Sequence, residues 1–310
     1  MQSSTPSRTA EFMALFRALE TIQPARQRLF ADPLAIGFLS PRLRAVVWLA
    51  RVPGLGRLVR DLIDRRWPGA RTSGVARTRL IDEAMTASLG AGARQIVLLG
   101  AGFDARAYRI PGIERARVYE VDHPATLAVK TERLAKLLGR VPAHVRFVAV
   151  DFNRQDLDTA LAGAGFEART RSFIVWEGVT NYLTDDAVDA TLRWAASAAA
   201  PQSRIVFTYV HRGLLDGSAR FTALGGVAAT LRNAAEPWTF GMNPEELPHY
   251  LASRGLVLLE DVGAADYRAR YMGAAARAMH GYEFYRAVLA EVGGGAAGPS
   301  GRAPVGAAAS

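Results

Sequence analysis

The sequence contains no cysteine and little lysine or histidine. Without cysteine, the chain cannot form disulfides, thiolate metal sites or a thiol nucleophile. No apolar run reaches the roughly 18 residues of a membrane-spanning helix, and the first residues lead into no apolar stretch typical of a secretion signal. No spacing of histidine, aspartate and glutamate is typical of a metal site. We therefore expect a cytoplasmic enzyme with no membrane span and no bound metal.

Arginine supplies nearly all of the positive charge. Of the 38 basic residues only Lys130 and Lys136 are lysine, and the net charge is +9. Residues 42–79 hold ten arginines against Asp61 and Asp64, so most of the excess charge lies in this segment. The bias is typical of a GC-rich genome, and two interpretations stay open. The segment is either a solvated face or a surface that favours an anionic acceptor or an acidic carrier protein.

Short apolar runs alternate with helical patterns through the middle of the chain. The expected strands are 95–99, 117–121, 145–150, 172–176, 204–210 and 256–262, and the expected helices between them are 125–138, 154–163 and 185–199. This alternation predicts βαβ units and an α/β fold with a doubly wound parallel sheet. Thr184 is the expected N-cap of the third helix, and Asn243, followed by Pro244, that of a later one.

The remaining composition divides the chain into segments. We predict a disordered start at 1–8, a helical N-terminal lid over 9–92 and the α/β domain over 93–292. An insertion at about 211–243 follows the fifth strand and is expected to cover the substrate. Residues 293–310 are low in complexity and predict a disordered tail.

A glycine turn follows the first expected strand. Residues 100–105 match the loose dinucleotide pattern G-x-G-x-x-G/A. Gly100 and Gly102 let a ligand press on the backbone, because neither has a Cβ. Asp104, however, lies inside the turn, where a pyrophosphate requires N–H groups and no negative charge. The turn therefore favours a cofactor without phosphate.

The next two strands also end in acids. Asp122 lies about 20 residues beyond the first glycine, where a carboxylate accepts hydrogen bonds from ribose hydroxyls in both nicotinamide and S-adenosylmethionine enzymes. Asp151, followed by Phe152, suits an adenine, because the carboxylate can accept from the amine while the ring is covered. Together with Asp104, these acids favour S-adenosylmethionine as the cofactor.

Two other classes of protein are weaker interpretations of the same features. One is an NAD(P)-dependent oxidoreductase that uses the turn at 100–105, although no Tyr-x-x-x-Lys pair is present. The other is a module that binds nucleic acid or a membrane through 42–79, where arginines occur beside Trp48 and Leu49. A binding module does not need acids at successive strand ends, so we predict no nucleic-acid partner.

The chain resembles the leucine carboxyl methyltransferase family, and within it the bacterial S-adenosylmethionine-dependent O-methyltransferases, several of which serve natural-product pathways. The resemblance rests on LFADPLA at 29–35, ARTRLID at 76–82, VLLGAGFDARAYR at 97–109, YEVDHPATLAVKTERL at 119–134, VAVDFN at 148–153, IVWEGVTNYLT at 174–184 and EPWTFGMNPEELPHYLASRG at 236–255. It implies a class I methyltransferase with a Rossmann-like sheet, acting on a carboxylate or hydroxyl of a small molecule.

The resemblance also implies roles for single residues. Arg77 would hold the carboxylate of the cofactor, since a guanidinium binds carboxylates with two hydrogen bonds. Gly100 would lie against the methionine part and Glu177 near its ammonium group or the reaction centre. Asp122 would take the ribose, and Asp151 would frame the adenine with Phe152, which replaces the usual leucine of the family.

The acceptor side is expected near the ends of the fourth and fifth strands. Glu177, Tyr182 and His211 are the candidate catalytic residues, and Asn181, Tyr182, Tyr209 and Arg212 the candidate substrate contacts. An ionised carboxylate acceptor needs no base, whereas a hydroxyl acceptor would use one such as His211.

Several of these residues also have a purely structural interpretation. His211 is compatible with an ordinary surface histidine, and Tyr182 with a core residue. Asp104 is a candidate contact of the cofactor, but it could instead cap the following turn or pair with Arg106 or Arg109, and His123 could cap a helix.

Overall fold

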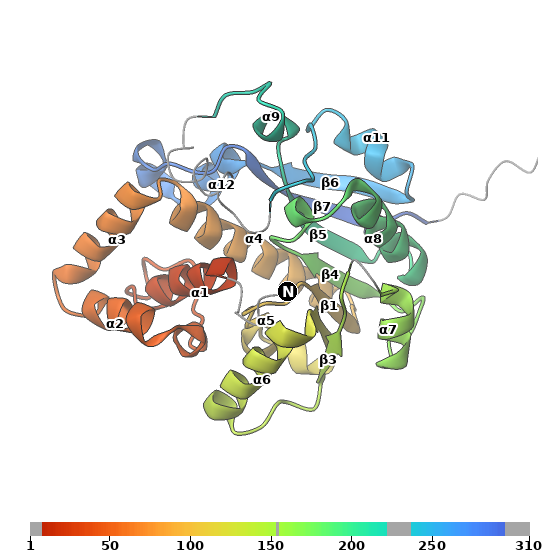
Figure 1. Ribbon diagram of the computed structural model, residues 1–310, viewed down its shortest axis with the longest axis horizontal. Coiled ribbons are helices and arrows are strands. Elements are labelled where there is room, and N and C mark those ends of the chain that lie inside the picture. Colours follow the sequence, from red (N-terminus) through yellow and green to blue (C-terminus); the bar gives the residue numbers. More distant parts are fainter. Residues whose placement is uncertain (1–7, 153–154, 222–236, 295–310) are drawn as a thin grey trace, which may run out of the picture.

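The computed structural model describes residues 8–152, 155–221 and 237–294 (Figure 1). Seven strands form one sheet in the order β3-β2-β1-β4-β5-β7-β6. Their bounds are β1 (Gln95–Leu99), β2 (Arg117–Asp122), β3 (Val145–Ala149), β4 (Ser172–Trp176), β5 (Arg204–Val210), β6 (Leu256–Val262) and β7 (Tyr285–Val292). The first five are parallel, and β7 lies antiparallel between β5 and β6. The predicted doubly wound α/β sheet is confirmed.

The described helices surround this sheet and extend it at the N-terminal side. They are α1 (Arg8–Thr21), α2 (Pro41–Ala50), α3 (Leu55–Arg66), α4 (Ala70–Gly90), α5 (Arg106–Arg109), α6 (Pro124–Leu138), α7 (Leu157–Gly163), α8 (Asp185–Ala198), α9 (Arg212–Leu215), α11 (Leu247–Ala252) and α12 (Ala264–Tyr271). Short 3₁₀ turns are η1 (Ala35–Phe38), η2 (Ile113–Arg115), η3 (Thr180–Tyr182) and η4 (Gly273–Ala278).

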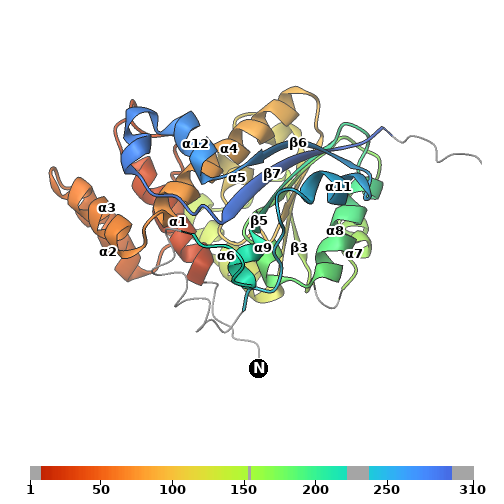
Figure 2. The same ribbon diagram turned by 90° about the horizontal axis from the view of Figure 1, so that it is seen from above.

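The two faces of the sheet are covered by different helices (Figure 2). Val97 and Leu99 of β1 pack into a core with residues of α7, α8 and α11. Ile96 and Leu98 point to the opposite face and pack with α4 and α5. Side chains of successive strand residues alternate between faces, so an unbroken apolar run such as 95–99 requires cover on both sides.

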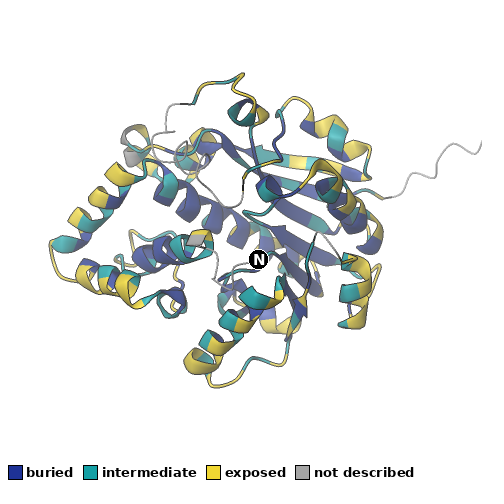
Figure 3. Cartoon of the chain, in the orientation of Figure 1, coloured by how far each residue is buried: buried dark blue, intermediate teal, exposed yellow. Residues whose placement is uncertain are grey.

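The helices before β1 form two layers. α4 packs directly on the sheet, and α1 packs on α4. α2 and α3 pack against each other outside this pair and project at one end of the molecule, with much of their surface exposed (Figures 1 and 3). The region 9–92, which the sequence predicts to be a helical lid, contains helices. Its longest helix, α4, packs directly on the sheet and so belongs to the layers of the α/β domain. Of the segments predicted to be disordered, 1–8 and 293–310, residues 1–7 and 295–310 lie outside the described residues, as do residues 222–236 of the predicted insertion. Arg8 already belongs to α1, and the N–H of Gly293 donates to the carbonyl of Gly255.

Most element boundaries follow the sequence pattern. The helix expected at 154–163 begins only at Leu157, because Asp156 is its N-cap and accepts from the N–H of Thr159. Two larger exceptions remain. The expected strand set lacks β7, in which Arg286 and Glu291 interrupt the apolar run. Both are paired across the sheet, Arg286 with Asp261 at 2.8 Å and Glu291 with Arg204 at 3.0 Å, so charged residues fit in this strand. Thr184 caps α8 as predicted, accepting from the N–H of Ala187.

The second exception is the start of the helix expected at Asn243. Residues 244–246 form a turn, and α11 begins only at Leu247, with Glu246 as its N-cap. The Asn243 side chain donates to Glu246 Oε1 at 3.1 Å instead of capping a helix. The prediction of Asn243 as N-cap was wrong, because the amide side chain stabilises the turn before the helix.

Candidate active site

The carboxyl ends of four neighbouring parallel strands lie at one edge of the sheet. β1 leads into Gly100, β2 ends at Asp122, β3 is followed by Asp151, and β4 by Glu177. The order β3-β2-β1-β4 places these ends side by side. Ligands of open α/β sheets bind at this edge, beside the point where the strand order reverses. The sheet therefore gathers the acids that the sequence singles out.

The glycine turn needs both of its glycines. Gly100 has a φ of +66°, and a Cβ on it would lie 2.3 Å from Cγ2 of Val179. Gly102 has a φ of +40°, and its N–H donates to Asp122 Oδ2 at 2.6 Å. Left-handed backbone favours glycine, and the close approach of Val179 disfavours a side chain at position 100. The turn is consequently held close to the ends of β2 and β4.

Asp122 is oriented by backbone N–H groups. Besides the N–H of Gly102, it accepts the N–H of His123 at 2.6 Å. Burial raises the pKa of Asp122, although these hydrogen bonds oppose the shift. A carboxylate has about four lone-pair sites, so two remain for further donors. His123 itself caps α6 through Nδ1, which accepts from the N–H of Ala125 at 3.3 Å, as its structural interpretation predicts.

Asp104 is paired within the turn. Its carboxylate accepts from the Arg106 backbone N–H at 2.7 Å and from the guanidinium at 2.5 Å. Burial would raise the pKa of Asp104, but Arg106, Arg17 and Lys130 outweigh it and hold the pKa at about 2. This is the structural pairing considered for Asp104, and it explains the acid without a contact to a cofactor.

Glu177 binds two buried arginines. Oε1 lies 3.3 Å from Nε of Arg77, and Oε2 lies 3.1 Å from Nη1 of Arg106. The guanidinium of Arg77 also lies over the ring of Tyr285, 4.5 Å from its centroid. Burial disfavours the charge of Arg77, yet the Glu177 carboxylate together with Tyr285 and Tyr267 outweighs it and raises the pKa of Arg77. Residues from α4, α5 and β4 thus meet in one charged cluster.

This cluster continues into the helices before β1, which sequence reasoning missed. Asp82 of α4 binds both Arg106, at 2.8 Å, and Arg109, at 2.7 Å. Arg17 of α1 binds Asp32 at 2.8 Å and donates to the carbonyl of Phe103 at 2.5 Å. The only signal in the sequence was that Asp82, Arg106 and Arg109 stand in two of the family motifs. These ion pairs connect α1 and α4 to the glycine turn.

One of the two lysines lies beneath the same turn. Nζ of Lys130 lies 2.8 Å from Oε2 of Glu120, and both side chains are completely buried. Nζ also donates to the carbonyl of Ala101, at 3.4 Å. Lys130 therefore supports the turn from α6, while Lys136 is exposed and pairs with Glu132.

Aromatic side chains gather beside the charged cluster. The ring of Trp238 contacts those of Tyr182, Phe284 and Tyr285 at centroid distances of 6.2 to 6.4 Å. Tyr182 and Trp238 are only partly buried. Sequence reasoning missed Trp238, Phe284 and Tyr285, because the last two belong to the unexpected β7 region. We call Tyr182, Trp238, Phe284 and Tyr285 the aromatic wall.

Asn181 lies next to this wall and is 1% exposed. Its backbone carbonyl accepts from the N–H of Thr239 at 2.8 Å. Within the part of the chain that the structure describes, Oδ1 of Asn181 has no hydrogen-bond partner. Buried polar atoms are nearly always paired, so this oxygen is suited to a donor that the chain itself does not supply.

The other three residues predicted on the acceptor side are Tyr209, His211 and Arg212. Each forms a hydrogen bond with another part of the chain. Tyr209 is completely buried, and its hydroxyl donates to Asp261 at 3.1 Å. His211 caps α9, with Nδ1 accepting from the N–H of Gly213 at 3.0 Å. Arg212 donates to the carbonyl of Gly241 at 3.1 Å. None of these hydrogen bonds reaches Glu177.

Asp151 and Phe152 lie where the sequence predicts them, directly after β3. The backbone N–H of Asp151 donates to Gln155 Oε1 at 2.9 Å. Phe152 packs against the core on the α7 and α8 face. Both belong to the edge at which β2 presents Asp122, which is compatible with an adenine site there.

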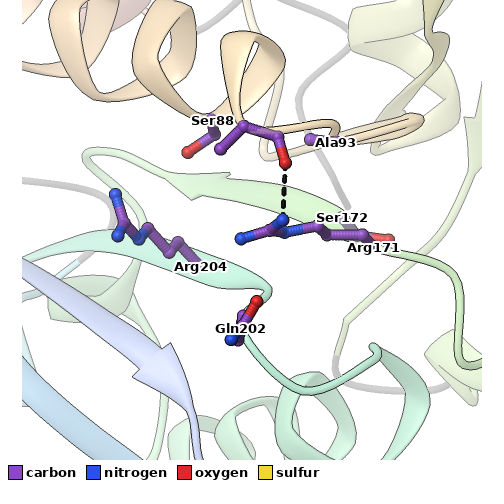
Figure 4. A pocket seen from close by; sticks show the side chains of 7 residues that line it. Ser88, Ala93, Arg171, Ser172, Gln202 and Arg204 are labelled. Atoms are coloured by element: carbon purple, nitrogen blue, oxygen red, sulfur yellow. Dashed lines mark hydrogen bonds between the residues drawn. The ribbon is translucent and has the colours of Figure 1, made fainter.

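Two hollows in the surface lie at the opposite, amino-terminal edge of the sheet. The smaller, shown in Figure 4, measures about 10 Å³ and is lined by Ser88, Ala91, Ala93, Arg171, Ser172, Gln202 and Arg204. It has room for about one water molecule. The larger, of about 330 Å³, surrounds the starts of β1 and β2. Neither contains a predicted site residue, so we assign the candidate site from the strand-end residues.

Two classes of feature are absent from the described ranges. No group of three or more histidine, aspartate and glutamate residues there could hold a metal ion. No helix there is long and apolar enough to cross a membrane.

Comparison with known proteins decides the family. The family model described as leucine carboxyl methyltransferase matches residues 10–196, more than half of the chain. This chain belongs to the leucine carboxyl methyltransferase family. A candidate S-adenosyl-L-methionine-dependent methyltransferase of Streptomyces coelicolor is 36% identical over 250 residues, covering 80% of this chain and 81% of the relative. A similarly named protein of Frankia alni is 34% identical over 221 residues, covering 71% of this chain and 74% of its own.

The fold agrees with a solved structure. A crystal structure described as a methyltransferase of Thermobifida fusca matches 94% of this chain and 97% of its own, with a TM-score of 0.52 and 17% identity. The protein is therefore an S-adenosylmethionine-dependent methyltransferase with a class I fold. The donor set at the sheet edge fits this cofactor, because it offers a guanidinium, two strand-end carboxylates and a third acid for the adenine.

Proposed function

We propose that the protein is an O-methyltransferase that methylates the carboxylate of a small, flat molecule, of the kind made in natural-product pathways. The observation that carries the proposal is the aromatic wall directly beside the cluster of Arg77, Arg106 and Glu177. Because Arg77 and Glu177 would bind the methionine part of the cofactor, the rings beside them would place a planar acceptor next to the methyl group. A hydroxyl acceptor is the second candidate.

Each residue at the sheet edge has a defined part in this proposal. S-adenosylmethionine, when bound, supplies a methyl group on a positively charged sulfur. Arg77 would bind the carboxylate of the cofactor, and Glu177 its ammonium group. Asp122 would accept from the ribose hydroxyls, while Asp151 and Phe152 would hold the adenine. Gly100 would let the methionine part approach the backbone.

The state of His211 supports a carboxylate acceptor over a hydroxyl. Its Nδ1 accepts a hydrogen bond from Gly213, so the proton of the neutral ring lies on Nε2. In this tautomer the ring has no free lone pair with which to take a proton. A carboxylate, with an ordinary pKa of about 4, is ionised at neutral pH and needs no base. Alignment of its oxygen with the methyl group then supplies much of the rate.

The aromatic wall and Asn181 support a planar acceptor. Trp238 and Tyr182 expose part of their rings, on which another ring can stack. The buried Oδ1 of Asn181 would accept a hydrogen bond from a ring hydroxyl or N–H group. A small molecule satisfies both features without a carrier protein.

Calorimetric titration tests the cofactor site. S-adenosylmethionine should bind with a micromolar dissociation constant, while NAD and NADP should not bind. Asp122→Ala should weaken binding at least about tenfold, whereas Asp61→Ala, which removes an exposed acid on α3, should leave it unchanged. Tight NAD binding would overturn the proposed cofactor site.

A matched pair of acceptors tests the oxygen that is methylated. 2-Naphthoic acid and 2-naphthol have the same rings, and the labelled methyl group of an ester is released by mild base whereas that of an ether is not. We expect base-labile product from the acid, and Trp238→Leu should raise its KM about tenfold. Base-stable product from the naphthol alone would favour the hydroxyl candidate.

A further inference from the structure

The hairpin of α2 and α3 exposes large apolar side chains that no described part of the chain covers. Five of them are about half exposed or more: Trp48 at 55%, Leu49 at 51%, Val52 at 47%, Leu58 at 59% and Leu62 at 65%. They lie along the end of α2, the connecting turn and α3. Large apolar side chains that gather on one exposed element mark an interaction site.

Helix geometry shows that the two leucines of α3 point directly outward. Leu58 and Leu62 are four residues apart and therefore share one face. The buried residues of α3, Gly56 and Ile63, lie on the opposite side of the helix. On α2, likewise, Val47 and Ala50 are buried while Trp48 and Leu49 are exposed. Both helices thus use one apolar side for the core and expose another.

Positive charge surrounds this apolar surface. The exposed arginines of the hairpin are Arg42, Arg44, Arg51, Arg57, Arg65 and Arg66. Against them stands one exposed acid, Asp61, because Asp64 is bound by Arg71 at 2.5 Å. The guanidinium of Arg51 lies 4.3 Å from the ring centroid of Trp48. Arginine and tryptophan together are typical of surfaces that contact the headgroup region of a lipid bilayer.

We propose that α2 and α3 bind the surface of an anionic lipid bilayer, with Trp48, Leu49, Val52, Leu58 and Leu62 entering the headgroup region and the exposed arginines contacting lipid phosphates. Charge complementarity selects an anionic occupant. A second copy of the chain would bring arginines against arginines. A nucleic acid would leave Leu58 and Leu62 without an apolar partner.

The position of the hairpin favours a lipid surface over an acidic protein. α2 and α3 project at one end of the molecule, as Figures 1 and 2 show, so the patch forms an outward edge. A bilayer accepts such an edge without a groove of matching shape. Because no described helix can cross a membrane, the attachment is peripheral. It would bring the enzyme to acceptors that partition into lipid.

Sedimentation with vesicles tests the proposal on the full chain. One set of vesicles contains phosphatidylcholine alone, and the other contains phosphatidylcholine and phosphatidylglycerol in equal parts. We expect the protein to bind the anionic vesicles at least about tenfold more tightly than the neutral ones. High salt should weaken this binding, because it screens the arginines.

Two double variants distinguish binding through the hairpin from nonspecific binding by any exposed apolar side chain. Leu58→Ser with Leu62→Ser should reduce binding to anionic vesicles at least about tenfold, with unchanged affinity for S-adenosylmethionine. Val257→Ser with Leu259→Ser removes two exposed apolar residues of β6, 55% and 45% exposed, and should leave vesicle binding unchanged. Absence of binding to anionic vesicles, or equal binding of the hairpin variant, would overturn the proposal. So would binding to an acidic protein partner without binding to vesicles.

Discussion

The arginines of the charged cluster and those of the α2–α3 hairpin show how one residue type serves two regions differently. Arg77 and Arg106 are 6% and 2% exposed, and each binds at least one carboxylate. Arg57 and Arg65 are exposed on α3 and have no ion pair among the described residues. The former hold the glycine turn against α4, while the latter contribute charge to a surface. Substitutions should therefore have large effects in the cluster and small effects in the hairpin.

The largest effect is expected from Arg106→Ala. The change leaves Asp82, Asp104 and Glu177 with one cation fewer in a buried site, and breaking such a network costs about 4 kcal/mol of unfolding free energy. Urea denaturation measures it. The matched control is Arg66→Ala on α3, which should stay within about 0.5 kcal/mol of the wild type. Equal effects of the two substitutions would contradict the comparison.

Lys130→Met should have the next largest effect and lower the free energy of unfolding by about 3 kcal/mol. The completely buried carboxylate of Glu120 would then have no cation at 2.8 Å. Adding Glu120→Gln should restore most of the stability, because the remaining charge is removed. A double-mutant cycle from denaturation curves gives the coupling. If the second substitution restores nothing, Lys130 acts on the turn through its size and not through this ion pair.

Gly100→Ala should lower the free energy of unfolding by about 2 kcal/mol. A side chain there meets Val179 Cγ2 at 2.3 Å and requires a φ of +66°. Val179→Ala in the same chain should recover the steric part only. Thermal unfolding of the four chains separates the two contributions, and full recovery would mean that the backbone conformation costs nothing.

Asp104→Asn should lower the free energy of unfolding by a similar or smaller amount, and this loss should depend on pH. Arg106, Arg17 and Lys130 together outweigh the effect of burial and lower the pKa of Asp104 to about 2 from an ordinary value of 3.8, so its ionised form stabilises the fold above about pH 4 by about 2 kcal/mol. This contribution is lost as the pH falls toward 2. Denaturation of both chains at pH 7, 4 and 3 should show the difference shrinking. A constant difference would mean that the lost hydrogen bonds, and not the charge, are responsible.

Much of the fold could be predicted from local pattern. The strands 95–99, 172–176 and 204–210 have the expected bounds, because buried parallel strands are continuous apolar runs with clear ends. The antiparallel edge strand 256–262 also has the expected bounds. β7 was missed, since Arg286 and Glu291 read as exposed until their cross-strand partners are known. The start of α11 was misplaced for a similar reason, as Asn243 had a nearer partner in Glu246.

The candidate site was predictable where it depends on strand ends. Asp122, Asp151 and Glu177 follow strands whose limits the sequence reveals, so their common edge could be inferred. The partners of Glu177 could not, because Arg106 lies 71 positions away along the chain and Arg77 lies 100. Tyr209 was expected at the acceptor but lies in the core, because its hydroxyl finds a partner in Asp261 of β6, a distant segment that lies beyond β7 in the sheet.

By itself, the sequence determined the α/β class, the glycine turn, the acids at the strand ends and the resemblance that named the cofactor. These features belong to short segments, so the local residue pattern and the backbone conformation that it favours are enough to predict them. Only the tertiary structure decided which charges are paired, which aromatic rings stand beside the charged cluster, and which apolar side chains remain exposed. The physical reason is that burial and partnership depend on distant segments. The same arginine is a buried support or a surface charge according to what packs against it.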